Sequence, residues 1–146
     1  MQYMNDVPNF FKKYVKYKTK YLMLRQYGGG KNNNKADYVK GVQEPWFTHI
    51  KEGRKTVEGR LDKGDFSKMK VGETIEWRNK GDKFRVKIIG INKYETFREY
   101  LETEGLENCL PNVDMVEDGI AVYRKFYSDE KEKQYGVLAI KVKVID

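Results

Sequence analysis

The chain has 146 residues, of which 39% are apolar and 14% aromatic, and it carries a formal net charge of +7. This composition excludes a chain that is disordered throughout, and the length fits one domain of ordinary size with a short additional segment. The first residues, MQYMNDVPNFF, lack the apolar run of a secretory signal, and no stretch approaches the roughly 18 apolar residues that span a bilayer. We therefore expect a soluble protein with no membrane span.

Cysteine and histidine are too rare for two common kinds of site. Cys109 is the only cysteine and His49 the only histidine, so we expect no internal disulfide and no Cys/His zinc site. We expect Cys109 to be a small core residue and His49 to lie on the surface of a helix. The sequence contains no phosphate-binding loop and no close pair of catalytic carboxylates, and we expect neither a metal nor a cofactor.

The excess positive charge is confined to the first quarter of the chain. Residues 1–35 contain eight basic side chains against Asp6 alone, whereas basic and acidic side chains are equal in number in residues 36–146. If the protein binds long RNA, this basic arm is expected to supply much of the nonspecific phosphate contact.

The same first quarter predicts a helix followed by a linker. Asn9 can cap a helix, and aromatic and apolar residues recur on one face of it at Phe10, Tyr14, Tyr17, Tyr21 and Leu24. Three glycines and the polar segment KNNNKAD follow. We interpret residues 1–27 as a basic amphipathic helix, 28–36 as a Gly/Asn-rich linker and 37–146 as the folded domain.

Residues 37–146 predict helices interspersed with strands. We first expect a helix from Pro45 through Ile50 that ends before Gly53, and then a strand over residues 55–61. Strands over 74–78 and 84–94 follow, joined by a turn at 80–82. We then expect a helix over 95–104 that ends at Gly105, a helix capped by Asp114 that carries Met115 to Phe126, a solvated loop over 129–133, and a last strand over 137–144. The strand-turn-strand unit at 74–94 is antiparallel. This pattern favours a small α+β fold with a curled or barrel-like sheet.

The segment GRKTVEGR, residues 53–60, is the candidate functional site. In an extended chain Thr56, Glu58 and Arg60 point to one side, and Lys55 can join the same polar face. One interpretation is a surface ion pair between Glu58 and Arg60 worth at most about 1 kcal/mol. The other is a cleft in which Lys55 and Arg60 hold a phosphate, carboxylate or carbonyl group while Glu58 orients Arg60 or takes a proton.

The same segment matches the G-x-K-x-x-E-x-R signature of the ASCH domain family, whose members have a β-barrel fold similar to the RNA-binding PUA domain. The resemblance extends from PWFTHIKEG before the signature to VYRKFYSDEKEKQYGVLAIKVKVI at the end, and so covers about residues 43–145. It implies a PUA-like barrel with flanking helices. It also favours the cleft interpretation of Lys55, Glu58 and Arg60.

The ASCH resemblance implies RNA or nucleotide binding as the function. Some relatives are amidohydrolases that remove acyl groups from modified cytidine, and ribonuclease activity also occurs in the family. In the amidohydrolases a threonine nucleophile stands three positions after the signature lysine, but here that position is Glu58, and Thr56 is adjacent to Lys55. A hydrolase acting on acylated nucleosides or RNA would therefore have to use Lys55 and Glu58 as its catalytic groups.

Further candidate ligand-binding residues lie outside the signature. In an ASCH-like barrel Tyr127 and Ser128 can reach the same cleft, although a turn in a surface loop explains them equally well. Four aromatic residues are candidates for stacking on bases or for core packing: Trp46, Phe47, Tyr94 and Tyr123.

The segment KKYVKYKTKYLMLRQYGGG resembles an N-terminal Tyr/Lys-rich segment found in proteins of giant DNA viruses related to mimiviruses. This resemblance implies a viral protein in the cytoplasm of an infected cell, in the viral factory or in the virion. The segment is expected to have a protein or nucleic-acid partner, so a viral protein-interaction module is a third interpretation of the function.

Overall fold

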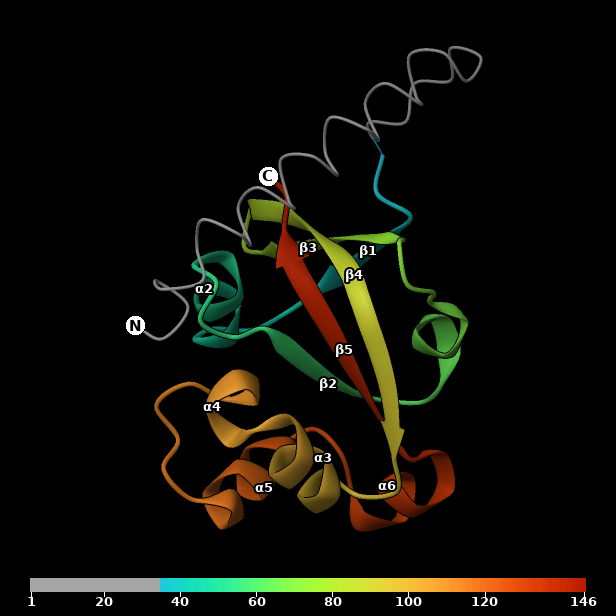
Figure 1. Cartoon of the computed structure of the whole chain (residues 1–146), viewed down its shortest axis with the longest axis vertical. Coiled ribbons are helices and arrows are strands. Elements are labelled where there is room, and N and C mark those ends of the chain that lie inside the picture. Colours follow the sequence, from blue (N-terminus) through green and yellow to red (C-terminus); the bar gives the residue numbers. More distant parts are fainter. Residues whose placement is uncertain (1–34) are drawn as a thin grey trace. The chain divides into compact units, whose positions relative to one another are not determined.

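A five-stranded sheet forms the centre of the computed structural model, which describes residues 35–146 (Figure 1). The strands are β1 (Tyr38–Gly41), β2 (Val57–Leu61), β3 (Thr74–Asn79), β4 (Asp82–Tyr94) and β5 (Val137–Val144). They lie in the order β1-β3-β4-β5-β2; β1 and β3 are parallel and the other neighbours are antiparallel. The sheet is a curled half-barrel with β1 and β2 at its edges. The expected α+β class is confirmed.

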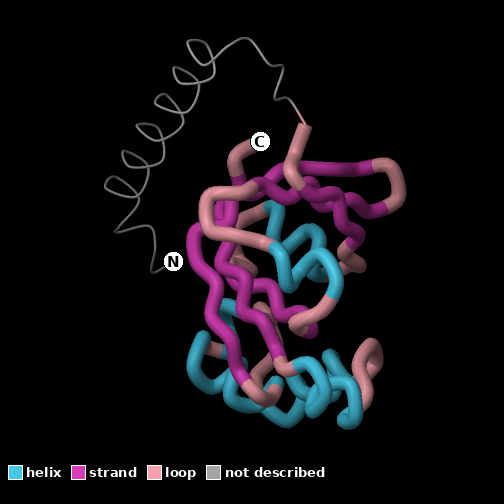
Figure 2. Tube along the Cα trace, turned by 90° about the vertical axis from the view of Figure 1, so that its right-hand side faces the viewer, coloured by secondary structure: helices cyan, strands magenta, loops and turns pink. Residues whose placement is uncertain are grey.

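Most of the helical segments gather at one end of this sheet. The segments are α2 (Trp46–Lys51), the 3₁₀ helix η1 (Gly64–Lys68), α3 (Phe97–Glu104), α4 (Leu106–Cys109), α5 (Val116–Arg124) and α6 (Asp129–Tyr135). Figures 1 and 2 show α3 to α6 together where β4 ends and β5 begins. The short segments β1, η1 and α4 were not expected from the sequence, because each is too short to show a hydrophobic period.

The two faces of the sheet contribute to two hydrophobic cores because side chains alternate along each strand. On one face Ile140 and its alternate neighbours pack with Phe47 and Ile50 of α2. On the other face Ala139 packs with Tyr100 of α3 and with other residues of α3 to α5. The strand β5 therefore contributes to both cores, and β2 pairs with it at the edge of the sheet.

The turn at Lys80 and Gly81 and the helix stop at Gly105 act as the sequence indicated, whereas the cap at Thr96 was not selected from the sequence. Lys80 and Gly81 both have positive φ, 46° and 88°, and form the two-residue turn between β3 and β4. The helix α3 begins after Thr96, whose side chain accepts a hydrogen bond from the Glu99 N–H at 3.1 Å, and ends at Gly105. Cys109 is fully buried, which confirms its expected place in the core.

Three local expectations were wrong. His49 is 7% exposed rather than on the surface, because its position on α2 faces the interior. Asp114 does not cap α5, which begins after Met115 without a side-chain cap. Residues 129–133 belong to α6 instead of a loop, because Ser128 caps this helix and Glu132, at its centre, accepts a hydrogen bond from the Phe97 N–H at 2.7 Å.

The expected helix over residues 1–27 and most of the linker over 28–36 lie outside the described residues, so they stay predictions. None of the helices in residues 35–146 has both the length and the apolar composition that a bilayer span requires. Within the same residues no group of three or more His, Cys, Asp or Glu side chains is placed to hold a metal ion.

Gly59→Ala is expected to destabilise the fold. A Cβ atom at Gly59 would lie 2.6 Å from Cζ and 2.7 Å from Oη of Tyr100, which is itself fully buried. Such overpacking costs about 1–3 kcal/mol in the free energy of unfolding, measured by urea denaturation. Gly41→Ala is the control, because the nearest atom to its Cβ would be 4.0 Å away. An equal effect of the two substitutions would contradict this explanation of Gly59.

Candidate functional site

Lys55 is held inside the protein by the turn that follows α2. Gly53, with φ of 81°, reverses the chain after α2, and the carbonyl of His49 then accepts hydrogen bonds from the N–H groups of Arg54 and Lys55. The Lys55 side chain is buried, and its ammonium group donates to the carbonyls of Val57, at 2.7 Å, and Cys109. A third contact joins Nζ to Oε1 of Glu58 at 3.2 Å. All three N–H bonds of the ammonium group thus have an acceptor.

Glu58 links Lys55 to Arg60 through its two carboxylate oxygens. Oε1 contacts Lys55 and accepts from the Gly59 N–H at 3.2 Å, whereas Oε2 accepts from Nε and Nη2 of Arg60 at 3.3 and 3.1 Å. Burial by itself raises the pKa of Glu58, but the charges of Lys55 and Arg60 outweigh burial and hold the pKa below its ordinary value of 4.5. Of the two interpretations of this segment, the surface ion pair is wrong, since Glu58 is buried.

Arg60 connects the ion cluster to the edge strand β1. Its Nη2 also donates to the carbonyl of Gly41 at 2.9 Å, and its guanidinium lies 4.8 Å from the ring centroid of Phe66 and 5.3 Å from that of Trp77. Burial lowers its pKa, but the carboxylate of Glu58 more than compensates, so the pKa lies above its ordinary value. We refer to Lys55, Glu58 and Arg60 as the ion cluster.

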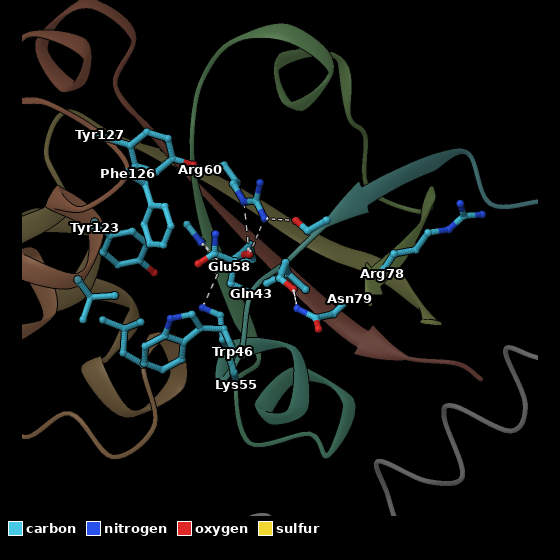
Figure 3. Close-up of a pocket in the computed structure, with 15 residues that line it drawn as sticks. Gln43, Trp46, Lys55, Glu58, Arg60, Arg78, Asn79, Tyr123, Phe126 and Tyr127 are labelled. Atoms are coloured by element: carbon cyan, nitrogen blue, oxygen red, sulfur yellow. Dashed lines mark hydrogen bonds and ion pairs between the residues drawn. The ribbon is translucent and has the colours of Figure 1, made fainter. Parts of the chain in front are cut away.

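The ion cluster lies in a cleft of about 410 Å³. Figure 3 shows the aromatic rings gathered on one side of this cleft and the arginines on the other. The aromatic side chains are Trp46, Tyr123, Phe126 and Tyr127, and the charged ones are Lys55, Glu58, Arg60 and Arg78. The charged lining residues sum to +2, so the cleft is positive although residues 36–146 are neutral as a whole. Its volume is within the range of small-molecule sites.

The aromatic side of the cleft has a rigid part and an exposed part. Phe97 lies between Tyr123 and Tyr127, with centroid distances of 4.5 and 5.6 Å and nearly parallel planes, and Tyr123 shares a 2.8 Å hydrogen bond with Tyr100. Burial raises the pKa of both Tyr123 and Tyr127. Phe126, by contrast, is 49% exposed although it lines the cleft. Phe126 is thus the aromatic ring of the cleft that is most open to solvent.

The predicted site residues are separated into three places. Lys55, Glu58, Arg60 and Tyr127 all line the cleft. Thr56 is exposed and lines a second, smaller cleft of about 190 Å³ with Lys141 and Asn108, because β2 begins only at Val57. The Oγ of Ser128 accepts a hydrogen bond from the Lys131 N–H at 3.2 Å and caps α6.

The four candidate stacking residues also divide between cleft and interior. Trp46 and Tyr123 line the cleft, and the indole of Trp46 lies 6.0 Å from the ammonium of Lys55. Phe47 is in the core, and the hydroxyl of Tyr94 donates a hydrogen bond to Glu104. Arg78, Gln43 and Asn79 line the cleft without having been selected from the sequence. They carry no local signal, because only the pairing of β1 with β3 brings them together.

Comparison with known proteins identifies the family. The sequence model of the ASCH domain matches residues 41–146, which is most of the chain. This chain belongs to the ASCH domain family. No curated protein matches it. Among solved structures, the ASCH domain is similar to the crystal structure of the hypothetical protein PH0355, with 44% sequence identity and a TM-score of 0.70 over 74% of this chain and 98% of that one.

A second archaeal structure gives the same result. The solution NMR structure of protein PF0455 from Pyrococcus furiosus is 44% identical, with a TM-score of 0.64 over 75% of this chain and 96% of that one. The resemblance to the ASCH family in the sequence is therefore confirmed, and the fold is consistent with a PUA-like domain. The resemblance of the N-terminal segment to giant-virus proteins stays a prediction.

Glu58→Gln is expected to lower the free energy of unfolding by about 3–5 kcal/mol at pH 7, because it leaves two buried cations without their carboxylate. Since the pKa of Glu58 is lowered by folding, its contribution is complete above about pH 5 and is lost as the pH falls through the lowered value. Urea denaturation of both proteins at several pH values measures the difference.

The control for Glu58→Gln is Glu117→Gln, which removes the carboxylate of an exposed ion pair with Arg98 and should have little effect. A difference between wild type and Glu58→Gln that stays constant down to pH 2 would contradict the assigned role of the ionised carboxylate.

Proposed function

We propose that this ASCH domain binds a nucleotide-like ligand, free or as part of RNA, in the cleft beside the ion cluster. The observation that carries the proposal is the arrangement of aromatic rings opposite arginines in a cleft of about 410 Å³. A nucleotide presents a flat base, which stacks on aromatic rings, and a phosphate, which arginine binds with parallel hydrogen bonds. Membership of the ASCH family, which is generally RNA-binding-like, supports the same ligand class.

The parts of the cleft have different tasks in this proposal. Phe126 is exposed and supplies a stacking surface, and Trp46 extends the aromatic side from α2. Arg78 is 56% exposed and its Nε donates to Glu76 at 2.6 Å, so an anion would bind its Nη groups, whereas Arg60 is fixed by Glu58 and the Gly41 carbonyl. Glu58 positions Arg60 through the ion pair between them, and Lys55 in turn holds Glu58. The fixed arginine sets where an anionic or carbonyl group binds, and the exposed one adds to its affinity.

The geometry favours a binding function over the hydrolase alternative. A general base must have a free lone pair and a pKa near the working pH. The ammonium of Lys55 donates to three acceptors, and the pKa of Glu58 is lowered, so that its carboxylate is a weak base. Both residues are thus suited to position Arg60. The interpretation as a viral interaction module rests on the N-terminal segment, outside the described residues, and stays a prediction.

Phe126→Ala is expected to weaken binding of a nucleoside 5′-monophosphate by about 5- to 100-fold, the loss typical of one base–aromatic contact. Isothermal titration of the full chain with the four ribonucleoside monophosphates measures this. Met115→Ala is the control, because Met115 is 58% exposed but does not line the cleft. The proposal would be rejected if wild type bound none of the four monophosphates, or if Phe126→Ala bound them as tightly as Met115→Ala.

Arg78→Ala is expected to weaken the binding of the monophosphates more than that of the corresponding nucleosides, because the arginine contacts the phosphate. The control is Arg98→Ala, which removes another exposed arginine that is paired with a glutamate, but on α3 and outside the cleft. Equal losses for nucleoside and monophosphate would contradict the phosphate contact.

A further inference from the structure

The outer edge of the strand β2 is not paired with another strand, because β2 ends the sheet beside β5. In an antiparallel pair, every second residue directs both its N–H and its C=O group at the partner strand. The N–H of Val142 donates to the carbonyl of Thr56 at 3.0 Å, and the N–H of Asp62 donates to that of Gly136 at 3.1 Å. The even-numbered residues therefore face β5, and the odd-numbered ones direct these groups to the open edge: Val57, Gly59 and Leu61.

Two of the three carbonyls on this open edge have a donor within the protein. The carbonyl of Val57 accepts from the ammonium of Lys55 at 2.7 Å, and that of Leu61 accepts from the N–H of Lys63 at 2.9 Å. The carbonyl of Gly59 lies between them, and no donor in residues 35–146 makes a hydrogen bond to it. Gly59 is buried, and a buried carbonyl without a donor is rare and costly. A donor supplied by a ligand would remove this cost.

Gly59 brings its carbonyl to the cleft. It is one of the residues that line the cleft, and a glycine can do so only with backbone atoms. Its N–H donates to Oε1 of Glu58 at 3.2 Å, so the carbonyl is the polar group of Gly59 that remains for a ligand. Because a Cβ atom at this position would collide with Tyr100, residue 59 has no side chain that could cover the carbonyl.

Gly59 lies on the aromatic side of the cleft. The ring of Tyr100 packs against it, and the hydroxyl of Tyr100 shares a 2.8 Å hydrogen bond with that of Tyr123, which lines the cleft. Figure 3 shows the hydroxyl of Tyr123 directed toward Glu58, the residue before Gly59. In the proposed function the base stacks on this side and the phosphate binds on the arginine side. The part of the ligand nearest to Gly59 is therefore the edge of the base.

A carbonyl can only accept, so the ligand must present an N–H group at this position. Each of the four RNA bases has such a group on the edge that forms Watson–Crick pairs. The donors are the amino groups of adenine and cytosine, the ring N–H of uracil, and both kinds of N–H in guanine. Unpaired bases in RNA are commonly recognised by hydrogen bonds to this edge. A base that donates from it to the protein cannot be paired with another base at the same time.

We propose that the backbone carbonyl of Gly59 accepts a hydrogen bond from the Watson–Crick edge of the bound base. This inference rests on the proposed function and deepens it, because it names the ligand class as an unpaired nucleotide with a free N–H on that edge. Gly59 is then the residue that distinguishes such a nucleotide from one whose edge is paired or lacks an N–H group.

The test changes the ligand, because Gly59→Ala is expected to destabilise the fold. Isothermal titration of the full chain compares each ribonucleoside 5′-monophosphate with an analogue that has no N–H on the Watson–Crick edge. The analogues are purine riboside 5′-monophosphate for AMP, 2-pyrimidinone riboside 5′-monophosphate for CMP, 3-methyl-UMP for UMP and 1,N2,N2-trimethyl-GMP for GMP. The control for the added methyl groups is 5-methyl-UMP, which carries its methyl group on the opposite edge.

We expect each monophosphate that binds to lose about 5- to 150-fold in affinity when the edge N–H is removed, because the analogue leaves the carbonyl without a donor. Binding of 5-methyl-UMP should match that of UMP. Purine riboside 5′-monophosphate and 2-pyrimidinone riboside 5′-monophosphate lack a group rather than gain one, so a loss with these two ligands is not due to a steric clash.

A second measurement locates the hydrogen bond. The carbonyl carbon-13 signal of Gly59 is recorded by NMR in the labelled full chain, saturated first with a monophosphate and then with its analogue. The signal should differ between the two ligands, because the hydrogen bond is present with only one of them. The carbonyl of Gly41 is the control: it also lines the cleft, but it accepts from Arg60 at 2.9 Å, so its signal should be the same with both ligands.

The outcomes separate this inference from the proposed function. Equal affinity for the monophosphates and their analogues would show that no base N–H is needed, and would overturn the inference while the cleft proposal stands. A loss of affinity without a change in the Gly59 signal would place the acceptor elsewhere and also overturn it. Absence of binding of all four monophosphates would overturn both proposals. A loss of affinity together with a change at Gly59 and none at Gly41 would support the inference.

Discussion

The burial of the Lys55 ammonium group is the constraint on which the site depends. A buried charge is costly unless every hydrogen bond is satisfied, so the three acceptors of Lys55 must be in place together. They come from the carbonyl of Val57, the carbonyl of Cys109 at the end of α4, and Glu58. The turn after α2, the strand β2 and the helical end of the domain are thereby joined at one ammonium group.

The fixed and exposed parts of the cleft follow from this constraint. Glu58 is held by Lys55 and in turn holds Arg60, which donates to the carbonyl of Gly41 on the opposite edge strand. One side of the cleft is thus set by backbone and ion contacts. Phe126 and Arg78, in contrast, are exposed, although Arg78 is also paired with Glu76 at 2.6 Å. A site with one fixed side and one exposed side suits a set of ligands that have one chemical group in common and differ in the rest.

Particular residues show how far the sequence predicts this fold and where prediction stops. The strands β2 to β5 and the helix α3 were predicted because alternation, the glycine turn at Gly81 and the helix stop at Gly105 are local signals. The helix α6 was missed since DEKEKQY has no apolar period; its stability comes from the Ser128 cap and from contacts of Glu132 with Phe97 and Arg124. His49 was placed on the wrong side of α2 because six residues are too few to define a helical face.

The sequence by itself determined the ASCH signature, the alternation that points Glu58 and Arg60 to one side of β2, and the equality of charges in residues 36–146. Only the tertiary structure decided that the ion cluster is buried, that Thr56 lines a different cleft, and that Arg78 and Phe126 meet at one cleft. The physical reason is that alternation and composition are properties of neighbouring residues. Burial and charge separation arise from strand pairs such as β1 with β3, which join residues far apart in the chain.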